Sequence, residues 1–259
     1  MRDSFWLRWL GDSERFVPET RSFRPEVVDS WLVDDGRTRA FDRHTARFTA
    51  ACPRLRPDRV RTFLDAVQER IPSAGRWFPR VEMASPEGNP QLTLWLRPAP
   101  PRGETVRLWV SPSPDGRTRP RVKGPDLTSL AQLRDAATEA GANEAVLLSR
   151  EGHVLEGSTT SLLWWRGEVL CGPPETAAIL PSVTRAEVLA LAAQRGIEFR
   201  PELSTPAELA GADVWTLNAL HGIRPVSAWA GSPFTTADLA RAEAWHHLLA
   251  ERTDHETVH

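Results

Sequence analysis

Val122-Lys-Gly-Pro-Asp-Leu127 contains the only lysine of the chain, since the other 31 of its 32 basic side chains are arginine. Most surface positions accept either cation, but arginine cannot replace lysine where an amine must lose its proton and attack a carbonyl. Lys123 is therefore a candidate Schiff-base lysine. The alternative is a surface lysine without a chemical role, and composition alone favours neither explanation.

Length and composition are those of an ordinary globular protein. The 259 residues are enough for one large domain or two small ones with a buried core. Apolar residues make up 41% of the chain, but no apolar run is long enough to span a membrane. The net charge is −2, with acidic residues interspersed among the arginines, so nothing indicates a surface that binds nucleic acid.

Cysteine usage and the N-terminal sequence indicate the cytoplasm. Cys52 and Cys171 are far apart and belong to no CxxC or Cys/His pattern, so both are expected to be free thiols, although one disulfide is compatible with the sequence. No HExxH pattern is present, and no metal site is expected. Charged residues interrupt the apolar N-terminal stretch, which makes it a poor signal peptide.

Helix and strand patterns alternate in the first half of the chain, which predicts an α/β (α+β) fold. Period-2 alternation predicts strands at residues 27–33, 77–83, 91–97 and 105–110, and period-3.6 spacing predicts helices at 41–50 and 58–70. The stretch from Ser111 to Pro120 is rich in Pro and Ser and resembles a linker. We therefore expect residues 1–120 to form an N-terminal α/β domain with its linker, and residues 121–259 to form a second domain.

The second half contains helices with clear start signals. Asp126 is a candidate N-cap for a helix from Leu127 to Ala140, whose apolar stripe (Leu127, Leu130, Leu133 and Ala137) is expected to be buried. Further elements are expected as helices at 184–195 and 236–252, a capping box at 205–208, and strands at 144–148, 153–155, 161–165, 168–170 and 213–217. Trp164 and Trp165 alternate on one strand, which predicts that one faces the core and the other an interface.

Four segments, together with their order and spacing, carry a family resemblance. They are Val122-Lys-Gly-Pro-Asp-Leu, Val154-Leu-Glu-Gly-Ser-Thr-Thr-Ser-Leu-Leu, Ile179-Leu-Pro-Ser-Val-Thr-Arg and Trp215-Thr-Leu-Asn-Ala-Leu, with a weaker fifth in Phe41-Asp-Arg-His-Thr-Ala-Arg-Phe48. Over roughly residues 27–225 the chain resembles the class IV aminotransferases, the fold type IV enzymes that use pyridoxal 5'-phosphate (PLP). This family includes branched-chain and D-amino-acid aminotransferases and 4-amino-4-deoxychorismate lyases. The resemblance implies two α/β domains with PLP in the cleft between them, residues 121–259 as the PLP-binding domain, and a homodimer.

The resemblance also implies roles for three charged residues. Lys123 matches the Schiff-base lysine that moves the substrate proton, and Glu156 matches the carboxylate that keeps the pyridine nitrogen protonated. Arg47 matches the arginine that pairs with the phosphate. The alternative for Glu156, a solvated turn glutamate, is less favoured because Lys123 accompanies it at the family spacing. The alternative for Arg47, a surface arginine on a helix, stays open because the chain has 31 arginines.

Main-chain groups are expected to complete the phosphate site. Ser182, Val183 and Thr184 begin a predicted helix, and a helix N-terminus presents free N–H groups and a positive dipole end to an anion. An ordinary capped helix start is the alternative. The resemblance implies a further cofactor contact near Asn218 and Ala219.

The chain departs from the family at three places. Ser182 stands where Gly is usual, and Leu127 lies near the position at which branched-chain aminotransferases tend to have Tyr. The strand Val28-Asp-Ser-Trp-Leu-Val33 and the segment before it lack the usual Gly-rich turn and the Phe-Glu or Thr-Thr pattern. Because that region helps to shape the substrate pocket in the family, the substrate is left open.

Two activities and one inactive alternative are compatible with these motifs. The short chain, the segment Asn218-Ala219-Leu220 and the missing Tyr favour a lyase of the 4-amino-4-deoxychorismate type, which expels pyruvate and leaves 4-aminobenzoate. The first alternative is a transaminase that acts on a small-molecule amine or amino acid. The second is a PLP-fold protein recruited for binding or assembly, without turnover.

Overall fold

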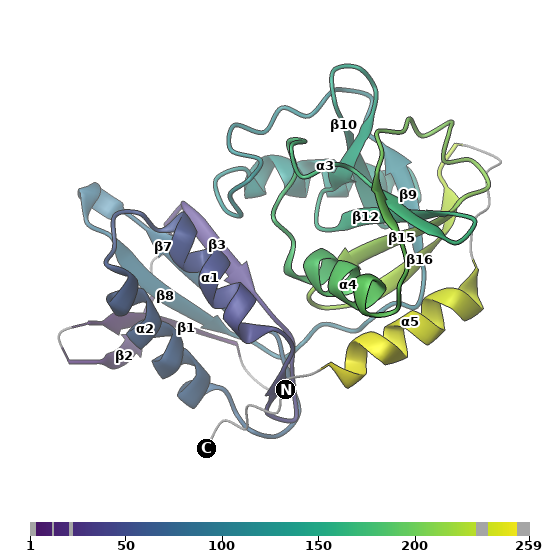
Figure 1. Cartoon of the computed structure of the whole chain (residues 1–259). Coiled ribbons are helices and arrows are strands. Elements are labelled where there is room, and N and C mark those ends of the chain that lie inside the picture. Colours follow the sequence, from purple (N-terminus) through teal and green to yellow (C-terminus); the bar gives the residue numbers. More distant parts are fainter. Residues whose placement is uncertain (1–3, 12, 21–22, 232–237, 253–259) are drawn as a thin grey trace. The chain divides into compact units, whose positions relative to one another are not determined.

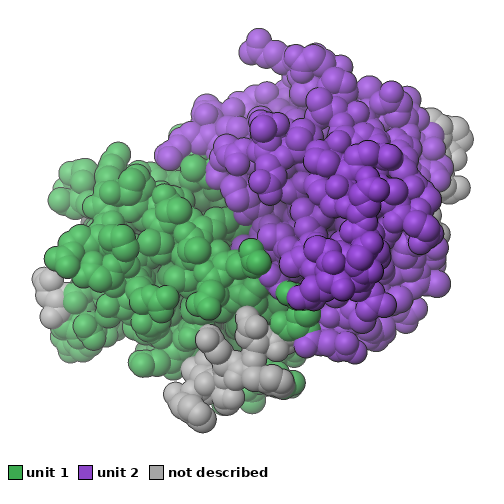
Figure 2. All heavy atoms as spheres, in the orientation of Figure 1, with its two compact units in different colours: residues 1–101, 122–125, 252–259 green, residues 102–121, 126–251 purple. Residues whose placement is uncertain are grey.

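The chain folds into two units, each with its own sheet. The computed structural model describes residues 4–11, 13–20, 23–231 and 238–252. The first unit holds the described residues up to Pro101, together with Val122–Pro125 and Arg252, and the second holds 102–121 and 126–251 (Figure 2). Lys123 thus belongs to the first unit. The boundary expected near Pro120 remains a prediction about separately folding domains.

The first unit is a sheet covered on one face by two helices. Its strands run in the order β2-β1-β8-β7-β3, and a smaller sheet has the order β5-β4-β6. The bounds are Phe5–Leu10 (β1), Arg15–Pro18 (β2), Val27–Ser30 (β3), Val33–Asp34 (β4), Arg37–Thr38 (β5), Arg76–Trp77 (β6), Arg80–Ala84 (β7), Gln91–Leu96 (β8), Phe41–Ala51 (α1) and Pro57–Arg70 (α2) (Figure 1). Strands β7 and β8 pair antiparallel across residues 85–90.

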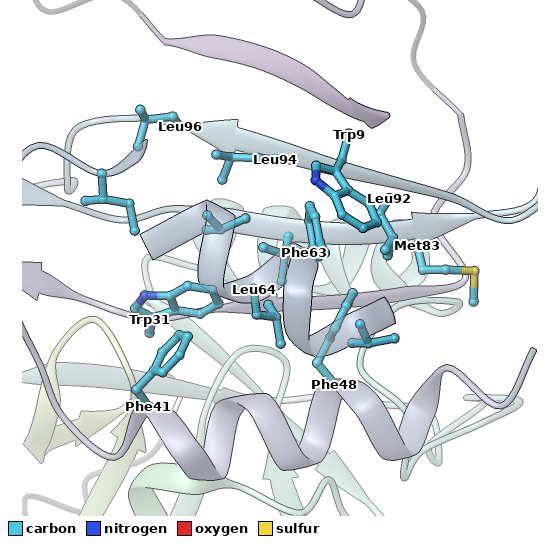
Figure 3. Close-up of a cluster of buried hydrophobic side chains, with 14 of the residues drawn as sticks. Trp9, Trp31, Phe41, Phe48, Phe63, Leu64, Met83, Leu92, Leu94 and Leu96 are labelled. Atoms are coloured by element: carbon cyan, nitrogen blue, oxygen red, sulfur yellow. The ribbon is translucent and has the colours of Figure 1, made fainter. Parts of the chain in front are cut away.

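Aromatic and aliphatic side chains join these helices to the sheet. Leu92, Leu94 and Leu96 alternate along β8, so all three face the same core (Figure 3). Trp31, after β3, packs edge-on against Phe41 of α1, with ring centroids 5.2 Å apart. Because buried aromatic pairs restrict each other's orientation, this packing fixes α1 against the end of β3.

The second unit is a curled sheet of eight strands in the order β11-β10-β9-β16-β15-β12-β13-β14. The bounds are Val106–Val110 (β9), Glu144–Leu148 (β10), Val154–Gly157 (β11), Ser161–Arg166 (β12), Val169–Gly172 (β13), Phe199–Pro201 (β14), Asp213–Asn218 (β15), Gly222–Trp229 (β16), Leu127–Glu139 (α3), Val183–Gln194 (α4) and Leu239–Glu251 (α5). Of the last predicted helix, residues 236–237 lie outside the described residues. No helix of the described residues is long and apolar enough to cross a membrane.

The topology brings three chain segments to one edge of this sheet. Strands β9, β10, β12 and β16 run in one direction, and β11, β13 and β15 run in the other. The carboxyl ends of β11, β13 and β15 therefore lie at the same edge. Glu156 lies near the end of β11, and Asn218 is the last residue of β15. The segment that leads into α4 follows the end of β13.

Three expectations about packing in the second unit were wrong. Both Trp164 and Trp165 are buried, because the sheet has a core on each face, and Trp165 packs against Trp215 and Trp245 rather than at an interface. On α3 only Ala137 is fully buried, since the leucines of the stripe are partly exposed. The segment from Ser111 to Pro120 is not a free linker, because it contains Asp115 and Arg117, whose side chains are buried.

The local capping signals were partly right. Ser182 caps α4, since its Oγ accepts a hydrogen bond from the Arg185 N–H at 3.2 Å. Asp126 stands at the start of α3 but does not cap it, because its carboxylate binds the main chain of Thr118 and Arg119 instead. The capping box at 205–208 forms its bonds, but only turns follow it. Both cysteines are buried free thiols, as expected.

Candidate cofactor site

Glu156 is a buried carboxylate of which one oxygen, Oε1, accepts hydrogen bonds. Its side chain is 4% exposed. Oε1 accepts two hydrogen bonds, from Nη1 of Arg117 at 2.5 Å and from the N–H of Leu180 at 2.8 Å. Within the described ranges Oε2 has no hydrogen-bond donor. Burial raises the pKa of Glu156 to about 7, although Arg117 and the Leu180 N–H oppose that rise.

The N-terminus of α4 lies beside Glu156, because Leu180 is only three residues before Val183. Val183 and Thr184 are buried, while Ser182 is half-buried. Their main-chain N–H groups belong to the first turn, which has no intrahelical acceptors. The arrangement suits an anion at this helix end. Arg185, in the same turn, donates to the carbonyl of Pro173 at 2.7 Å.

Asn218 ends β15 and shapes the turn into β16. Its Oδ1 accepts the N–H of His221 at 2.8 Å, which leaves Ala219 in a turn closed by a side chain. Asn218 and Ala219 are both half-buried. The turn therefore presents main-chain groups at the same sheet edge as Glu156.

In the first unit Arg47 belongs to a buried cluster with Asp29 and His44. Nε and Nη2 of Arg47 bind both carboxylate oxygens of Asp29, at 2.9 and 2.7 Å, and Nδ1 of His44 lies 2.8 Å from Oδ1. Burial alone would raise the pKa of Asp29, but Arg47 and His44 outweigh it and hold that pKa far below its usual range. Burial lowers the pKa of His44, so the neutral ring donates its Nδ1–H to the carboxylate.

Lys123 is fixed to the same strand as Asp29. Its carbonyl accepts the N–H of Val28 at 2.7 Å, and its side chain is half-buried. The next residue, Gly124, has φ +153, and a Cβ there would come within 2.5 Å of the carbonyl oxygen of Glu26. Only glycine therefore lets this segment run so close to β3.

The structure brings the predicted residues together in two sets. In the first unit, Lys123 and Arg47 both attach to β3, through Val28 and Asp29. In the second, Glu156, the start of α4 and Asn218 share one sheet edge. Their individual roles in binding PLP remain predictions.

Three partners of these residues were missed from the sequence. Asp29 was part of a strand that departs from the family pattern, and His44 stood in the weaker fifth motif without a role of its own. The third partner, Arg117, was hidden in a segment with linker-like composition. For His44 and Arg47 a usable signal existed, because residues three apart on a helix share a face.

Comparison with known proteins identifies the family. Residues 26–229 match the model for amino-transferase class IV. The chain belongs to the class IV aminotransferase family. These are PLP-dependent enzymes, and PLP is the cofactor that membership of the family assigns to the chain. The recognition made from the five motifs is thereby confirmed.

Relatives in the family differ in their named substrates. The chain is 31% identical to the D-alanine aminotransferase of Bacillus licheniformis over 108 residues, 41% of this chain and 38% of that protein. It is 32% identical to a putative branched-chain-amino-acid aminotransferase of Methanocaldococcus jannaschii over 131 residues, 49% of this chain and 46% of that protein. The matched segments thus cover less than half of the length of each relative.

Solved structures of the family confirm the α/β fold. A hypothetical aminotransferase from Mycobacterium tuberculosis superimposes with a TM-score of 0.80 at 18% identity, over 95% of this chain and 98% of that one. The fold IV transaminase CpuTA1 from Curtobacterium pusillum gives 0.78 at 18% identity, over 96% and 98%. The M. tuberculosis protein is also known in a PLP-bound form.

Proposed function

We propose that the protein is a PLP-dependent enzyme that transfers the amino group of a small amine or amino acid, with Lys123 as its catalytic residue. When bound, PLP draws electrons from the amine-bearing carbon of a substrate, most strongly when its pyridine nitrogen is protonated. The residues of this chain would bind the cofactor, orient it and move one proton.

The observation that carries the proposal is that only one of the two carboxylate oxygens of Glu156 accepts hydrogen bonds from the described residues. Oε1 is engaged by Arg117 and Leu180, and Oε2 accepts no hydrogen bond from the described residues. The Glu156 side chain has little access to water, and a cationic N–H is the best partner for its second oxygen. The protonated pyridine nitrogen is such a donor, so Glu156 fits the cofactor.

Two features of the chain, the start of α4 and the guanidinium of Arg47, have the chemistry to bind the phosphate. The first N–H groups of α4, at Val183 and Thr184, would bind its oxygens together with the turn at Asn218 and Ala219. The guanidinium of Arg47 would neutralise its charge, held in orientation by Asp29. Ser182 would contribute through its position as the N-cap of α4.

Lys123 is the only side-chain amine of the chain. It would hold the aldehyde of the cofactor covalently and, once displaced by the substrate amine, remove the proton from the amine-bearing carbon.

Borohydride reduction tests this proposal directly. The protein is incubated with excess PLP, reduced, digested and examined by mass spectrometry, with Lys123→Arg as the matched control. We expect a pyridoxyl group on the peptide that contains Lys123, and none in the control. An unmodified peptide after incubation with excess PLP would remove the basis for any PLP enzyme, and would favour the fold without turnover.

A lyase of the 4-amino-4-deoxychorismate type is the second candidate, favoured by the short chain, the Asn218-Ala219-Leu220 segment and the absence of Tyr. The relatives named above are aminotransferases, which favours transamination. An assay of amino donors with pyruvate or 2-oxoglutarate, run beside aminodeoxychorismate, separates the two. Formation of 4-aminobenzoate and pyruvate from aminodeoxychorismate, with no transamination of any amino donor, would replace transamination by elimination.

We also propose a homodimer in the cytoplasm, as the resemblance implies. Light scattering of the purified protein should give twice the mass of the 28.9 kDa chain. A monomeric mass at micromolar concentration would contradict the dimer.

A further inference from the structure

Arg117 connects two buried carboxylates. Its Nε and Nη2 bind the carboxylate of Asp115 at 2.8–3.0 Å, while Nη1 donates to Oε1 of Glu156 at 2.5 Å. Nη2 also donates to the carbonyl of Ala178 at 2.9 Å. The side chains of Arg117, Asp115 and Glu156 are 7%, 9% and 4% exposed. A planar guanidinium held on both edges has little freedom to turn away from Glu156.

The main chain anchors this arrangement to the strand next to Glu156. The N–H of Asp115 donates to the carbonyl of Leu148, on β10, at 2.8 Å. Strand β10 pairs with β11, where Leu147 lies opposite Glu156. The N–H of Arg117 returns to Oδ1 of Asp115 at 3.1 Å. The Asp115–Arg117 pair is therefore attached to the sheet that carries Glu156.

Three charged side chains act on Glu156. Burial raises its pKa to about 7, Arg117 lowers it, and Asp115 raises it further. The third is Arg185, which interacts with both Glu156 and Glu175, and whose own pKa is lowered by burial. Among the described residues only Arg117 donates a charged hydrogen bond to Glu156, so its removal would raise the pKa of Glu156 further and favour the neutral acid.

We propose that Arg117 is a positioning residue for the cofactor, because it holds Glu156 through Oε1 and favours the ionised carboxylate, so that Oε2 can accept the N–H of the pyridine ring. The inference rests on the role of Glu156 in the proposed function. Arg117 could instead serve only to hold residues 111–120 against the sheet. In that case the effect of its removal on cofactor binding would change neither with the ring nitrogen nor with the ionisation of Glu156.

The test compares PLP with an analogue in which a CH group replaces the ring nitrogen. Two variants of the full chain are used. Asp115→Asn with Arg117→Met removes both charges of the pair, so that no buried charge is left alone, and Arg117→Lys keeps the cation. Arg121→Met is the matched control, since the partners of Arg121 in the described part of the chain are the carbonyls of Glu175 and Ala177. Dissociation constants are measured for both cofactors between pH 7 and pH 9.

We expect the double variant to bind PLP about fivefold more weakly at pH 7, because a rise of about one unit in the pKa of Glu156 lowers its ionised fraction at pH 7 from about one half to about one tenth. This loss should shrink towards pH 9, where Glu156 ionises again, and should be absent for the CH analogue. Arg117→Lys should lose less, and Arg121→Met nothing. An equal loss for both cofactors, a loss independent of pH, or no loss at all would overturn the inference.

The outcome also separates this inference from the proposed function. If the unmodified protein fails to bind PLP, the proposed function fails and the role of Arg117 falls with it. If it binds PLP and forms the Lys123 adduct, but the variants treat both cofactors alike, only the role of Arg117 is lost.

Discussion

The two units each contain a buried carboxylate beside an arginine, yet the pKa values of the two carboxylates are shifted in opposite directions. Asp29 receives hydrogen bonds from Arg47 and His44, and its pKa lies far below the usual range. Glu156 shares its arginine with Asp115, and burial raises its pKa to about 7. The comparison teaches that a neighbouring guanidinium does not by itself fix the charge of a buried acid. What differs is the set of donors: Arg47 binds both oxygens of Asp29 and His44 adds a third contact, whereas Arg117 gives Glu156 a single bond and Asp115 opposes it.

Replacement of the acid in the first cluster should have the largest effect on stability. Asp29→Asn leaves the cation of Arg47 partly buried without its counter-ion, and breaking a buried pair in this way costs about 3 kcal/mol. Urea unfolding at pH 7 measures the change. Asp58→Asn is the control, because Asp58 forms an equally bidentate pair with Arg56 that is exposed to water, and no measurable loss is expected. Equal losses in both variants would contradict the importance of burial.

Replacement of the acid in the second cluster should affect turnover rather than folding. Glu156→Gln keeps the shape and the acceptor for Arg117, but an amide cannot balance a protonated pyridine ring. We expect turnover to fall on the order of 100-fold, the usual loss of one electrostatic contact in an active site, while the Lys123 adduct still forms. Steady-state kinetics with an established amino donor measures the fall. Unchanged turnover would mean that Glu156 is not the partner of the ring nitrogen.

The opposite pKa directions predict opposite pH dependences of stability. Glu156 holds a proton in the folded state up to about pH 7, above its ordinary value of 4.5, so its contribution is full below pH 4.5 and is lost as the pH rises through 7. Asp29, with a lowered pKa, contributes above its ordinary value of 3.8 and loses that contribution only in acid. Between pH 4.5 and 7 the unmodified protein should lose at most about 1.4 kcal/mol per pH unit relative to Glu156→Gln.

Urea unfolding of the unmodified protein, Glu156→Gln and Asp29→Asn across this range provides the measurement. A constant difference between the unmodified protein and Glu156→Gln from pH 4.5 to 8 would show that Glu156 titrates near its ordinary value. The Asp29→Asn difference should by contrast stay level over the same range.

The sequence was a good guide wherever the information was local. Lys123, the start of α4 at Ser182 and the strands β12 and β13 follow from residue type, capping chemistry and period-2 alternation, and the structure has that helix start and those two strands. Arg117 could not be found in this way. Its partner Glu156 is 39 residues away, and the composition between Ser111 and Pro120 is typical of a solvated linker. Long-range pairing gives such a segment its structure, and no local pattern records it.

The smallest expected effect concerns His44, the neutral partner of Asp29. His44→Leu removes the Nδ1–H donor from a carboxylate that keeps Arg47, and a hydrogen bond to a charged group contributes about 1.5 kcal/mol. His44→Asn can offer an amide N–H instead, so its loss should be smaller, limited to packing of the ring near Trp31. Unfolding in urea at pH 7 ranks the three proteins. If Leu and Asn cost the same, the ring of His44 matters only as a space filler. Arg47 alone would then account for the low pKa of Asp29, and the two clusters would differ simply by the presence of a second acid beside Arg117.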